Sequence, residues 1–518
     1  MSNVPKTTNI VIVGAGWAGQ GVCEALGSET LSHTVITCID ESETLAVGAT
    51  WQFALDGRAK PLDVPLAKTS AARYLRKGSV KSIDYGAKHV NMKFGVLPYD
   101  HLVLACGAVS DPSTIPGLAE HATDLTAKGF TDDIERFLDG VQKGRDNKTV
   151  AICIAKCPYK CPPLPFEVAF LIDDAARRRG VRGALEIKVT SPVPWPFGGP
   201  KAKQAFAAAM AAKGITYLPD TPLTAIVERD GRKCVTTGAA ELVADLVLAT
   251  FPHRAPEFLK DLATAKGSVP VDLRTNATSK EGVYAVGDAC AALIPSAGVP
   301  IPKAGEFAYK AGLALGTRLA AIVRGVEAAL PLERSARCVA ETGGGEGITV
   351  GPNFDAAFVD PEQGKPAFTI EPHPDGTSAK VEWIQSYLDR FAPDQGIVFE
   401  PGAPRNAESL VIFRFDTGPE ANGTVTGGEK NNFNFLIRGA EVASRAGGML
   451  SFRGPQVSLG SPRVSTIHVQ SPTPYTPPLP SPDASTRMHL QLAQCIWQKF
   501  PNIYFRAPWE PQAPAYAA

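Results

Sequence analysis

Three cysteines stand at a four-residue spacing in the segment "CIAKCPYKCPPLPFE", residues 153–167: Cys153, Cys157 and Cys161. Thiols act as redox groups or nucleophiles, and a thiolate is stabilised where a helix begins. The residues before the segment, "KTVAI", favour a buried strand, and those after it, "VAFLIDDAARRRG", favour a helix. Cys161 therefore opens the predicted helix as a candidate reactive thiol; the alternative is a buried apolar residue. Cys153 falls inside the strand and is expected in the core.

Cys157 has two interpretations, a further sulfur carrier or an ordinary turn residue. A zinc site made by the three cysteines is not predicted, because no second group of Cys or His at ligand spacing completes a tetrahedral set. We therefore expect no metal. Ten cysteines in 518 residues do not form a disulfide scaffold either, and most of the others fall in predicted strands or helices.

A glycine-rich turn lies near the N-terminus, in "NIVIVGAGWAGQGVCEALGS", residues 9–28. Gly14, Gly16 and Gly19 have the G-x-G-x-x-G spacing between a strand of β-branched residues and a helix. The first glycine allows the turn, the second admits a pyrophosphate, and the third lets helix and strand pack closely. Asp40 ends the next predicted strand, where a carboxylate accepts from a ribose hydroxyl. The arrangement predicts a dinucleotide site; a Gly-rich turn in an unrelated α/β domain is the alternative.

The strand, turn and helix around the three cysteines have the order of a second phosphate cradle without its glycines. The turn reads "AKCPYKCPP", in which side chains and proline rings occupy the space that a pyrophosphate needs. Proline also lacks the amide hydrogen that would bind phosphate at a helix N-terminus. We therefore expect that this part of the chain keeps the fold and does not bind NAD(P)H.

Two later segments are similar to the flavoprotein superfamily that has two dinucleotide-binding domains. Ala105 and Gly107, in "YDHLVLACGAV", fit its Ala-x-Gly strand, and Gly287 and Asp288, in "EGVYAVGDACA", fit its Gly-Asp segment. The resemblance implies FAD as the cofactor, with the first segment closing over the flavin and the second binding the ribityl chain. Asp288 has a helix cap as its other interpretation.

Four stretches resemble the sulfide dehydrogenase flavoproteins of flavocytochrome c and the sulfide:quinone oxidoreductases. They read "CPPLPFEVA", "KAKQAFAAAMAAKGITYLP", "GVPIPKAGEFAYKAG" and "ARCVAETGGGEGITVGPNF". The resemblance covers about residues 8–390. It implies an FAD-dependent oxidoreductase that oxidises sulfide or a related small sulfur compound. The electrons would pass to a quinone or a c-type cytochrome.

The resemblance also implies roles for single residues. Cys161 and Cys338 become a redox pair that faces each other over the flavin, and Lys303 lies on the flavin side, where it stabilises the reduced ring. Glu167 either takes protons from bound hydrosulfide or is a first-turn glutamate favoured by the helix dipole. Cys338 and Lys303 have plainer interpretations as well, a strand residue and a solvated lysine before a helix.

The number of cysteines bears on which type of sulfide-oxidising relative the chain resembles. The quinone-reducing relatives carry a third working cysteine, and none stands between Cys106 and Cys153, which favours the two-cysteine flavocytochrome type. That type is normally exported, yet no export signal is visible.

Two other functions stay open beside sulfide oxidation as the first. The second function is an NAD(P)H:acceptor flavin reductase with a degenerate second cradle. The third is a redox-sensing or scaffold flavoprotein without turnover.

The whole pattern predicts an α/β protein with two Rossmann-like three-layer domains. An FAD domain is expected at residues 1–110 and 255–325, split by a second Rossmann-like domain at residues 111–254. A C-terminal interface domain is expected at residues 326–395, and an irregular Pro/Gly-rich tail at residues 396–518.

Charge and hydropathy restrict the partners. Lys plus Arg and Asp plus Glu number 52 each, so no basic excess exists to neutralise a nucleic acid. No secretory signal and no run of about 18 apolar residues is visible. We therefore expect a soluble cytoplasmic protein or a peripheral membrane protein. In the tail, residues 485–500 are the one expected helix and could contact a membrane, whereas the proline run 471–482 excludes helix and central strand.

Overall fold

The computed structural model describes residues 7–399 with short gaps, and five strands beyond them. The gaps are at residues 143, 145, 239, 265–266, 273, 295–297, 299, 328–332 and 361–362. The chain forms two compact units. Unit 1 comprises Met1–Leu55 and Pro61–Ile397, and unit 2 comprises Asp56–Lys60 and Val398–Ala518. Each unit is described by itself.

The first sheet of unit 1 has five parallel strands in the order β21-β9-β1-β2-β5. Its strands are β1 (Thr8–Val13), β2 (Thr34–Asp40), β5 (Leu75–Lys77), β9 (His101–Leu104) and β21 (Val283–Ala285). The central strands are runs of Ile, Val and Leu that are almost fully buried, as expected where both faces of a parallel sheet are covered. All five carboxyl ends meet at one edge of the sheet, the edge where ligands bind in open α/β sheets.

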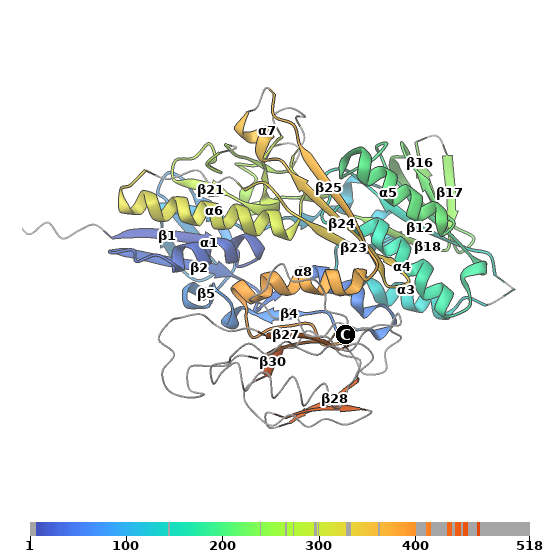
Figure 1. Cartoon of the computed structure of the whole chain (residues 1–518). Coiled ribbons are helices and arrows are strands. Elements are labelled where there is room, and N and C mark those ends of the chain that lie inside the picture. Colours follow the sequence, from blue (N-terminus) through green and yellow to red (C-terminus); the bar gives the residue numbers. More distant parts are fainter. Residues whose placement is uncertain are drawn as a thin grey trace, which may run out of the picture. The chain divides into compact units, whose positions relative to one another are not determined.

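Helices α1 (Trp17–Gly27) and α6 (Gly305–Arg324) pack against each other next to this sheet (Figure 1). Glycines let the two backbones approach closely. A Cβ atom on Gly312 of α6 would lie 2.0 Å from the Ala18 carbonyl oxygen, and one on Gly21 of α1 would lie 2.2 Å from the Tyr309 carbonyl oxygen. The contact fixes the helix that leaves the glycine-rich turn against the helix that begins near the Gly-Asp segment.

The second sheet is also parallel, in the order β11-β18-β12-β13-β14. Its strands are β11 (Thr123–Asp124), β12 (Lys148–Ile154), β13 (Leu185–Thr190), β14 (Ile215–Leu218) and β18 (Leu246–Thr250). The helices of this region are α3 (Phe130–Asp139), α4 (Leu164–Arg178) and α5 (Gly199–Ala212). Cys153 lies in β12 and is fully buried, as the sequence predicts. The predicted strand, turn and helix around the cysteines are therefore β12, the loop 155–163 and α4.

A third, antiparallel sheet has the order β23-β24-β25. It comprises β23 (Cys338–Gly343), β24 (Glu346–Asn353) and β25 (Ala367–His373), with helices α7 (Asp355–Val359) and α8 (Gly376–Phe391). Strand β23 contacts both α4 and α8, so this sheet joins the second parallel sheet to the C-terminal helix of unit 1.

Short strands complete unit 1. An antiparallel sheet contains β15 (Leu223–Arg229), β16 (Arg232–Thr237) and β17 (Ala240–Ala244), and another contains β6 (Val80–Asp84), β7 (His89–Met92) and β8 (Val96–Pro98). The remaining pairs are β3 (Thr44–Ala46) with β4 (Asp63–Pro65), β10 (Val109–Ser110) with β19 (His253–Arg254), and β20 (Val269–Pro270) with β22 (Cys290–Ala291). Helix α2 (Leu118–His121) is a single turn. The β10–β19 pair lies where the chain passes between the two parallel sheets.

The described strands of the tail belong to unit 2. They are β26 (Val411–Phe415), β27 (Phe433–Ile437), β28 (Glu441–Ala446), β29 (Met449–Arg453) and β30 (Val464–Thr466), in two small antiparallel sheets. The sequence analysis did not anticipate them, because short alternating runs between glycines and prolines carry little periodic signal. The predicted helix 485–500 and the proline run 471–482 lie outside the described residues.

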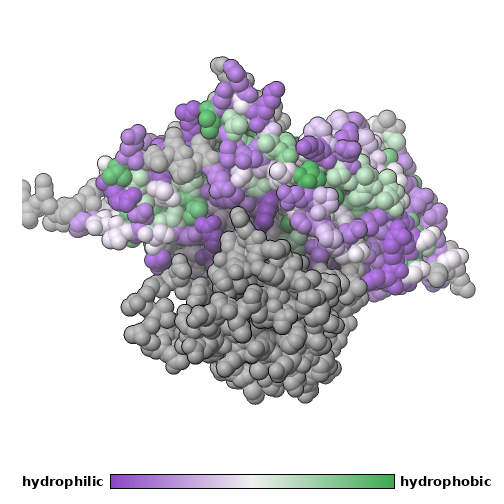
Figure 2. All heavy atoms as spheres, in the orientation of Figure 1, coloured by the Kyte–Doolittle hydropathy of each residue, from purple (hydrophilic) through white to green (hydrophobic). Residues whose placement is uncertain are grey.

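The predicted α/β class with two Rossmann-like parallel sheets is confirmed. The predicted domain boundaries stay a prediction. Among the described residues, the helices include none with the length and apolar character needed to cross a membrane. On the face of unit 1 seen in Figure 2, apolar residues form small separate spots among hydrophilic ones.

Gly312→Val is expected to lower the free energy of unfolding by about 3 kcal/mol, because the new side chain forces α1 and α6 apart. Chemical denaturation followed by circular dichroism measures the change. Thr317→Val, at an exposed position of the same helix, is the control and should change stability by less than about 0.5 kcal/mol. Equal stability of both variants would contradict a backbone contact between the helices.

Candidate functional site

The glycine-rich turn connects β1 to α1, and its glycines have different surroundings. Gly14 has φ +103°, and a Cβ there would lie 2.4 Å from the Ala105 carbonyl oxygen. A Cβ on Gly19 would lie 2.0 Å from the Gly14 carbonyl oxygen, so helix and turn touch through it. A Cβ on Gly16 would meet no atom within 4 Å. Gly14 and Gly19 therefore serve internal packing, whereas Gly16 borders open space at the N-terminus of α1.

Asp40 ends β2 next to this turn. Its Oδ2 accepts a hydrogen bond from the Ala15 N–H at 2.7 Å, and its Oδ1 accepts one from the Ser42 N–H at 2.7 Å. Both bonds orient the carboxylate at the carboxyl edge of the sheet. Gly107, which follows β9 with φ +67° and open space at its Cβ position, lies along the same edge. The structure thus brings the predicted cofactor residues of three strand ends together.

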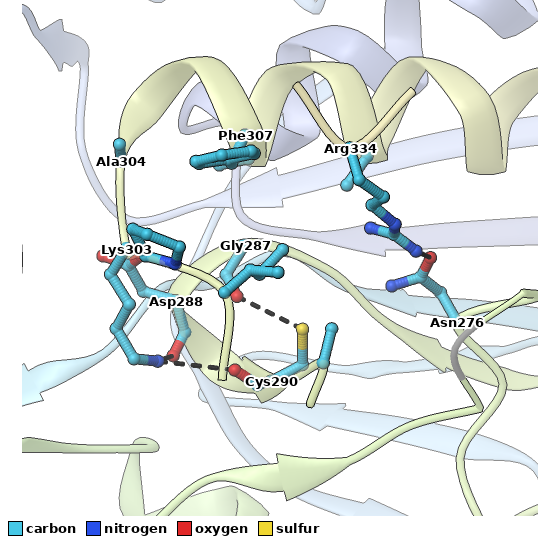
Figure 3. Close-up of a pocket in the computed structure, with 13 residues that line it drawn as sticks. Asn276, Gly287, Asp288, Cys290, Lys303, Ala304, Phe307 and Arg334 are labelled. Atoms are coloured by element: carbon cyan, nitrogen blue, oxygen red, sulfur yellow. Dashed lines mark hydrogen bonds between the residues drawn. The ribbon is translucent and has the colours of Figure 1, made fainter. Parts of the chain in front are cut away.

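The Gly-Asp segment follows β21 and borders a pocket (Figure 3). Gly287 has φ +70°, which glycine adopts without strain. Lys303 lines the same pocket, and its Nζ donates to the carbonyl oxygens of Asp288 at 2.6 Å and Cys290 at 3.4 Å. Burial lowers the pKa of Lys303, and the charge of Asp288 opposes this shift. Two separately predicted cofactor residues, Asp288 and Lys303, therefore lie together, with the ammonium group directed at backbone oxygens.

Cys161 lies in the loop between β12 and α4 and has φ +53°, a conformation that L-residues other than glycine seldom adopt. Its N–H donates to the Lys303 carbonyl oxygen at 2.8 Å. Helix α4 begins three residues later, at Leu164. Burial raises the pKa of the Cys161 thiol to about 12; the charge of Glu167 also raises it and that of Lys380 lowers it. The thiolate stabilisation expected from the helix N-terminus is therefore outweighed by desolvation.

Cys338 is the first residue of β23. Burial raises the pKa of its thiol well above the ordinary value, and the neighbouring Cys161 thiol is the next largest cause of the shift. The two thiols are thus near enough to interact electrostatically, although Cys161 lies in the loop after β12 and Cys338 begins β23. Both are free cysteines in this structure, and their bonding in a redox cycle stays a prediction.

Glu167 lies in the first turn of α4 and is buried. Its Oε1 accepts hydrogen bonds from Lys380 Nζ at 2.5 Å and from the Glu341 N–H at 3.0 Å. Burial raises the pKa of Glu167, against the opposing charge of Lys380. The carboxylate therefore joins α4 to α8 and to β23. Its predicted role as a proton acceptor stays a prediction.

The N-terminus of α4 uses its own amide groups. The Leu164 N–H donates to the Cys161 carbonyl oxygen at 2.9 Å, and the Phe166 N–H donates to the Pro163 carbonyl oxygen at 3.1 Å. Pro165, between them, has no N–H. A phosphate at this helix start would find no free donor in the first three residues of α4. The expected loss of the second cradle stays a prediction.

An aromatic cluster packs beside the start of α4, with neighbouring ring centroids 4.9–6.3 Å apart. Its members are Phe166, Trp195, Phe197, Phe206 and Tyr217. Cys157 and Cys161 pack against the core that contains these rings. The cluster was not predicted from the sequence; the signal available was the aromatic and proline segment "PVPWPF", residues 192–197.

Two lysines at the site were also missed, Lys380 and Lys160. Lys380 is almost fully buried in α8, where nothing in the sequence distinguishes it from a surface lysine. Lys160 directly precedes Cys161 and contacts Ala108 after β9 and Asp288 after β21. Among the described residues, no group of three or more His, Cys, Asp or Glu side chains could hold a metal ion.

Residues 8–152 match the family model of the pyridine nucleotide-disulphide oxidoreductases. The type II NADH:quinone oxidoreductase of Staphylococcus aureus is 24% identical over 345 residues, which cover 61% of this chain and 83% of that protein. The sulfide:quinone oxidoreductase from Aquifex aeolicus has a similar structure, with a TM-score of 0.61 at 16% identity over 77% of this chain and 98% of that chain.

The NAD-dependent persulfide reductase from A. fulgidus is similar too, with a TM-score of 0.50 at 19% identity over 67% of this chain and 63% of that chain. At these identities the two structures indicate a common fold. The residues in place fit FAD, because the open space at Gly16 and the oriented carboxylate of Asp40 lie at one edge of the first sheet. The chain therefore resembles the flavin-dependent pyridine nucleotide-disulphide oxidoreductases, whose family model residues 8–152 match, and the edge of its first sheet has residues in place to hold FAD.

Proposed function

We propose that this flavoprotein oxidises sulfide, or a related small sulfur compound, through Cys161 and Cys338, and passes the electrons to a quinone or a c-type cytochrome. One observation carries the proposal: the backbone N–H of Cys161 donates to the Lys303 carbonyl oxygen beside the Gly-Asp segment, and the charge of Cys161 contributes to the raised pKa of Cys338. A thiol pair next to the expected flavin edge suits electron transfer between sulfur and FAD.

The similar proteins support this choice in part. One solved structure of the same fold is a sulfide:quinone oxidoreductase and another is a persulfide reductase. Their names state sulfide for the one and persulfide for the other. The type II NADH:quinone oxidoreductase supports a quinone as the acceptor.

The thiol chemistry starts from a disulfide between Cys161 and Cys338. Hydrosulfide attacks one sulfur, the disulfide bond breaks, and a new S–S bond leaves a persulfide on one cysteine and a thiolate on the other. A second sulfur nucleophile takes the outer sulfur away and leaves a thiol. The two thiols return to the disulfide by losing two protons and two electrons. Bound FAD supplies the acceptor for these two electrons.

The residues around the pair have separate tasks in this proposal. The loop 155–163 holds the Cys161 backbone at Lys303. Glu167 and Lys380 fix α4 and α8 beneath the thiols and add charges of opposite sign near them. Lys303 places a cation beside Asp288, where negative charge on a reduced flavin would be stabilised.

An NAD(P)H:acceptor flavin reductase is the second candidate. The similarity to the NADH:quinone oxidoreductase favours it, since that match covers 61% of this chain. The amide groups at the start of α4 disfavour it, because they are already hydrogen-bonded within the loop or absent at Pro165. The two candidates differ in which reductant reaches the flavin.

Anaerobic titration separates them. Sulfide is expected to bleach the flavin absorption band of the wild-type holoprotein, whereas NADH at the same concentration should reduce it at least about a hundredfold more slowly. Cys161→Ser and Cys338→Ser should keep FAD and lose reduction by sulfide, because no disulfide can form. Cys234→Ala, buried in β16 of another sheet, is the control and should react like the wild type. Faster reduction by NADH would favour the second candidate, and no reduction by either would indicate a sensing role.

Gly16→Val should abolish FAD binding and leave the fold intact. The valine meets no protein atom, and Gly16 has an ordinary φ of −68°, so the free energy of unfolding should change by less than about 1 kcal/mol. The side chain instead fills the space that a pyrophosphate needs. Flavin absorbance per protein measures occupancy.

Gly183→Val is the matched control for this variant, because a Cβ there also meets no atom within 4 Å. It lies before β13 in the second parallel sheet, away from the glycine-rich turn. It should keep its full flavin content. A yellow Gly16→Val protein with full occupancy would mean that the cofactor lies elsewhere.

The alkylation of Cys161 in the reduced protein should depend steeply on pH. Its pKa of about 12 means that the reactive thiolate is a minor species below that pH and grows about tenfold per pH unit. The rate of reaction with iodoacetamide should therefore rise steadily from pH 7 to pH 10 without a plateau. The same cysteine in urea should level off near pH 9, close to the ordinary thiol pKa. A plateau below pH 9 in the folded protein would contradict a raised pKa of the Cys161 thiol.

A further inference from the structure

Lys160, directly before Cys161, reaches from the thiol loop to the first parallel sheet. Its Nζ donates a hydrogen bond to the Ala108 carbonyl oxygen at 2.8 Å, in the segment that follows β9. The same ammonium group lies 3.9 Å from a carboxylate oxygen of Asp288, at the end that follows β21. One side chain therefore contacts two of the strand ends to which the sequence assigns FAD contacts.

The backbone of the same residue is held from another side. Lys160 and Lys303 form an isolated parallel β-bridge, and the next N–H, that of Cys161, donates to the Lys303 carbonyl oxygen at 2.8 Å. Lys303 in turn extends to the carbonyl oxygens of Asp288 and Cys290 (Figure 3). The loop with the thiols is thus attached to the Gly-Asp segment both through the Lys160 side chain and through backbone hydrogen bonds.

The strengths of these contacts differ. A hydrogen bond from an ammonium group to a carbonyl oxygen is charge-assisted and about twice as strong as a neutral one. The ion pair with Asp288 is long and its side chains are 31% and 23% exposed, so it adds less. His253 lies in the same cluster, and burial together with the charges of Lys303 and Lys160 lowers its pKa to about 4. His253 is therefore neutral at pH 7 and does not repel the lysines.

The Cys161 backbone needs such an anchor. A cysteine at φ +53° is held in a conformation that costs free energy, and such residues persist only where their surroundings fix them. If the attachment to Ala108 is removed, the loop gains the freedom to relax to an ordinary conformation. The thiol would then spend more time in water, where its pKa falls toward the ordinary value and its reactivity rises.

We propose that Lys160 is a positioning residue that holds the Cys161 loop against the FAD edge of the first sheet through the Ala108 carbonyl. The inference rests on the proposed function, in which Cys161 belongs to the redox pair. It assigns to Lys160 no contact with substrate. Its effect on the reaction would come through the placement of the cysteine that follows it.

The test measures alkylation of each cysteine in the reduced holoprotein at pH 8 by iodoacetamide and peptide mass spectrometry. Lys160→Met keeps the length of the side chain and removes the charge and the donor. Lys160→Arg keeps both and is the conservative rescue. Lys156→Met changes an exposed lysine of the same loop and is the matched control. All variants are compared at full flavin occupancy, and Lys160→Gln replaces Lys160→Met if the latter does not accumulate as holoprotein.

Lys160→Met should label Cys161 at least tenfold faster than the wild type, with Cys106 and Cys153 unchanged. Lys160→Arg should stay within about threefold, and Lys156→Met within about twofold. Wild-type labelling in Lys160→Met would overturn the proposal. So would equal acceleration at all buried cysteines, which indicates general loosening, or an equal effect of Lys160→Arg.

The labelling needs no sulfide, so it is separate from the test of the proposed function. If sulfide reduces the wild-type flavin, Lys160→Met should slow this reduction at least tenfold while the flavin content stays full, and an unchanged rate would count against the positioning role. If sulfide does not reduce the wild type, the proposed function fails and the labelling result alone decides the role of Lys160.

Discussion

A buried ion pair between Glu167 and Lys380 holds together the elements that carry the two thiols. Its side chains are 3% and 1% exposed, so neither charge has enough water around it to be stable alone. Glu167 belongs to α4, which follows the Cys161 loop, and Lys380 belongs to α8. The Glu341 N–H of β23, the strand that starts at Cys338, completes the group. Breaking such a pair leaves an unpaired buried charge and destabilises a protein by about 3–5 kcal/mol. The pair therefore opposes any separation of these three elements.

The same burial that requires the ion pair sets the acidity of the thiols. Desolvation is the first cause of the raised pKa at Cys161 and at Cys338, and the nearby carboxylate of Glu167 acts in the same direction. Lys380 opposes both shifts. A reduced pair in this environment is protonated at neutral pH. An external sulfur nucleophile and a disulfide therefore make a more suitable starting state than a standing thiolate.

Local features of the site could be predicted from the sequence because they depend on few neighbours. The glycine spacing, the strand-ending Asp40 and the prolines at the start of α4 act within one turn or one strand end. The parallel sheets followed from buried apolar runs. The pKa of Cys161 could not be predicted, since the residues that desolvate it come from distant parts of the chain. The helix dipole alone suggests a lowered pKa of Cys161, and the effect of burial outweighs it.

Partners that are distant in sequence account for the other missing features. Lys380 stands 213 residues from Glu167, and Lys160 stands 52 residues from Ala108, so no local spacing marks either contact. The aromatic cluster combines residues of α4, α5, β14 and the loop after β13, each unremarkable alone. In the tail, the strands of unit 2 interrupt a Pro/Gly-rich composition that suggested irregular structure. Tertiary pairing decides in each of these cases.

A thiol loop and a phosphate cradle make opposite demands on the start of α4. A pyrophosphate needs free amide groups and a glycine turn with no side chains in the way. The thiol loop needs a side chain at Cys161. The Leu164 N–H already donates to the Cys161 carbonyl oxygen, and Pro165 has no N–H. The two uses therefore exclude each other at this helix. The second parallel sheet positions the thiol loop, because β12 and α4 flank this loop and the Cys161 N–H donates to the Lys303 carbonyl oxygen.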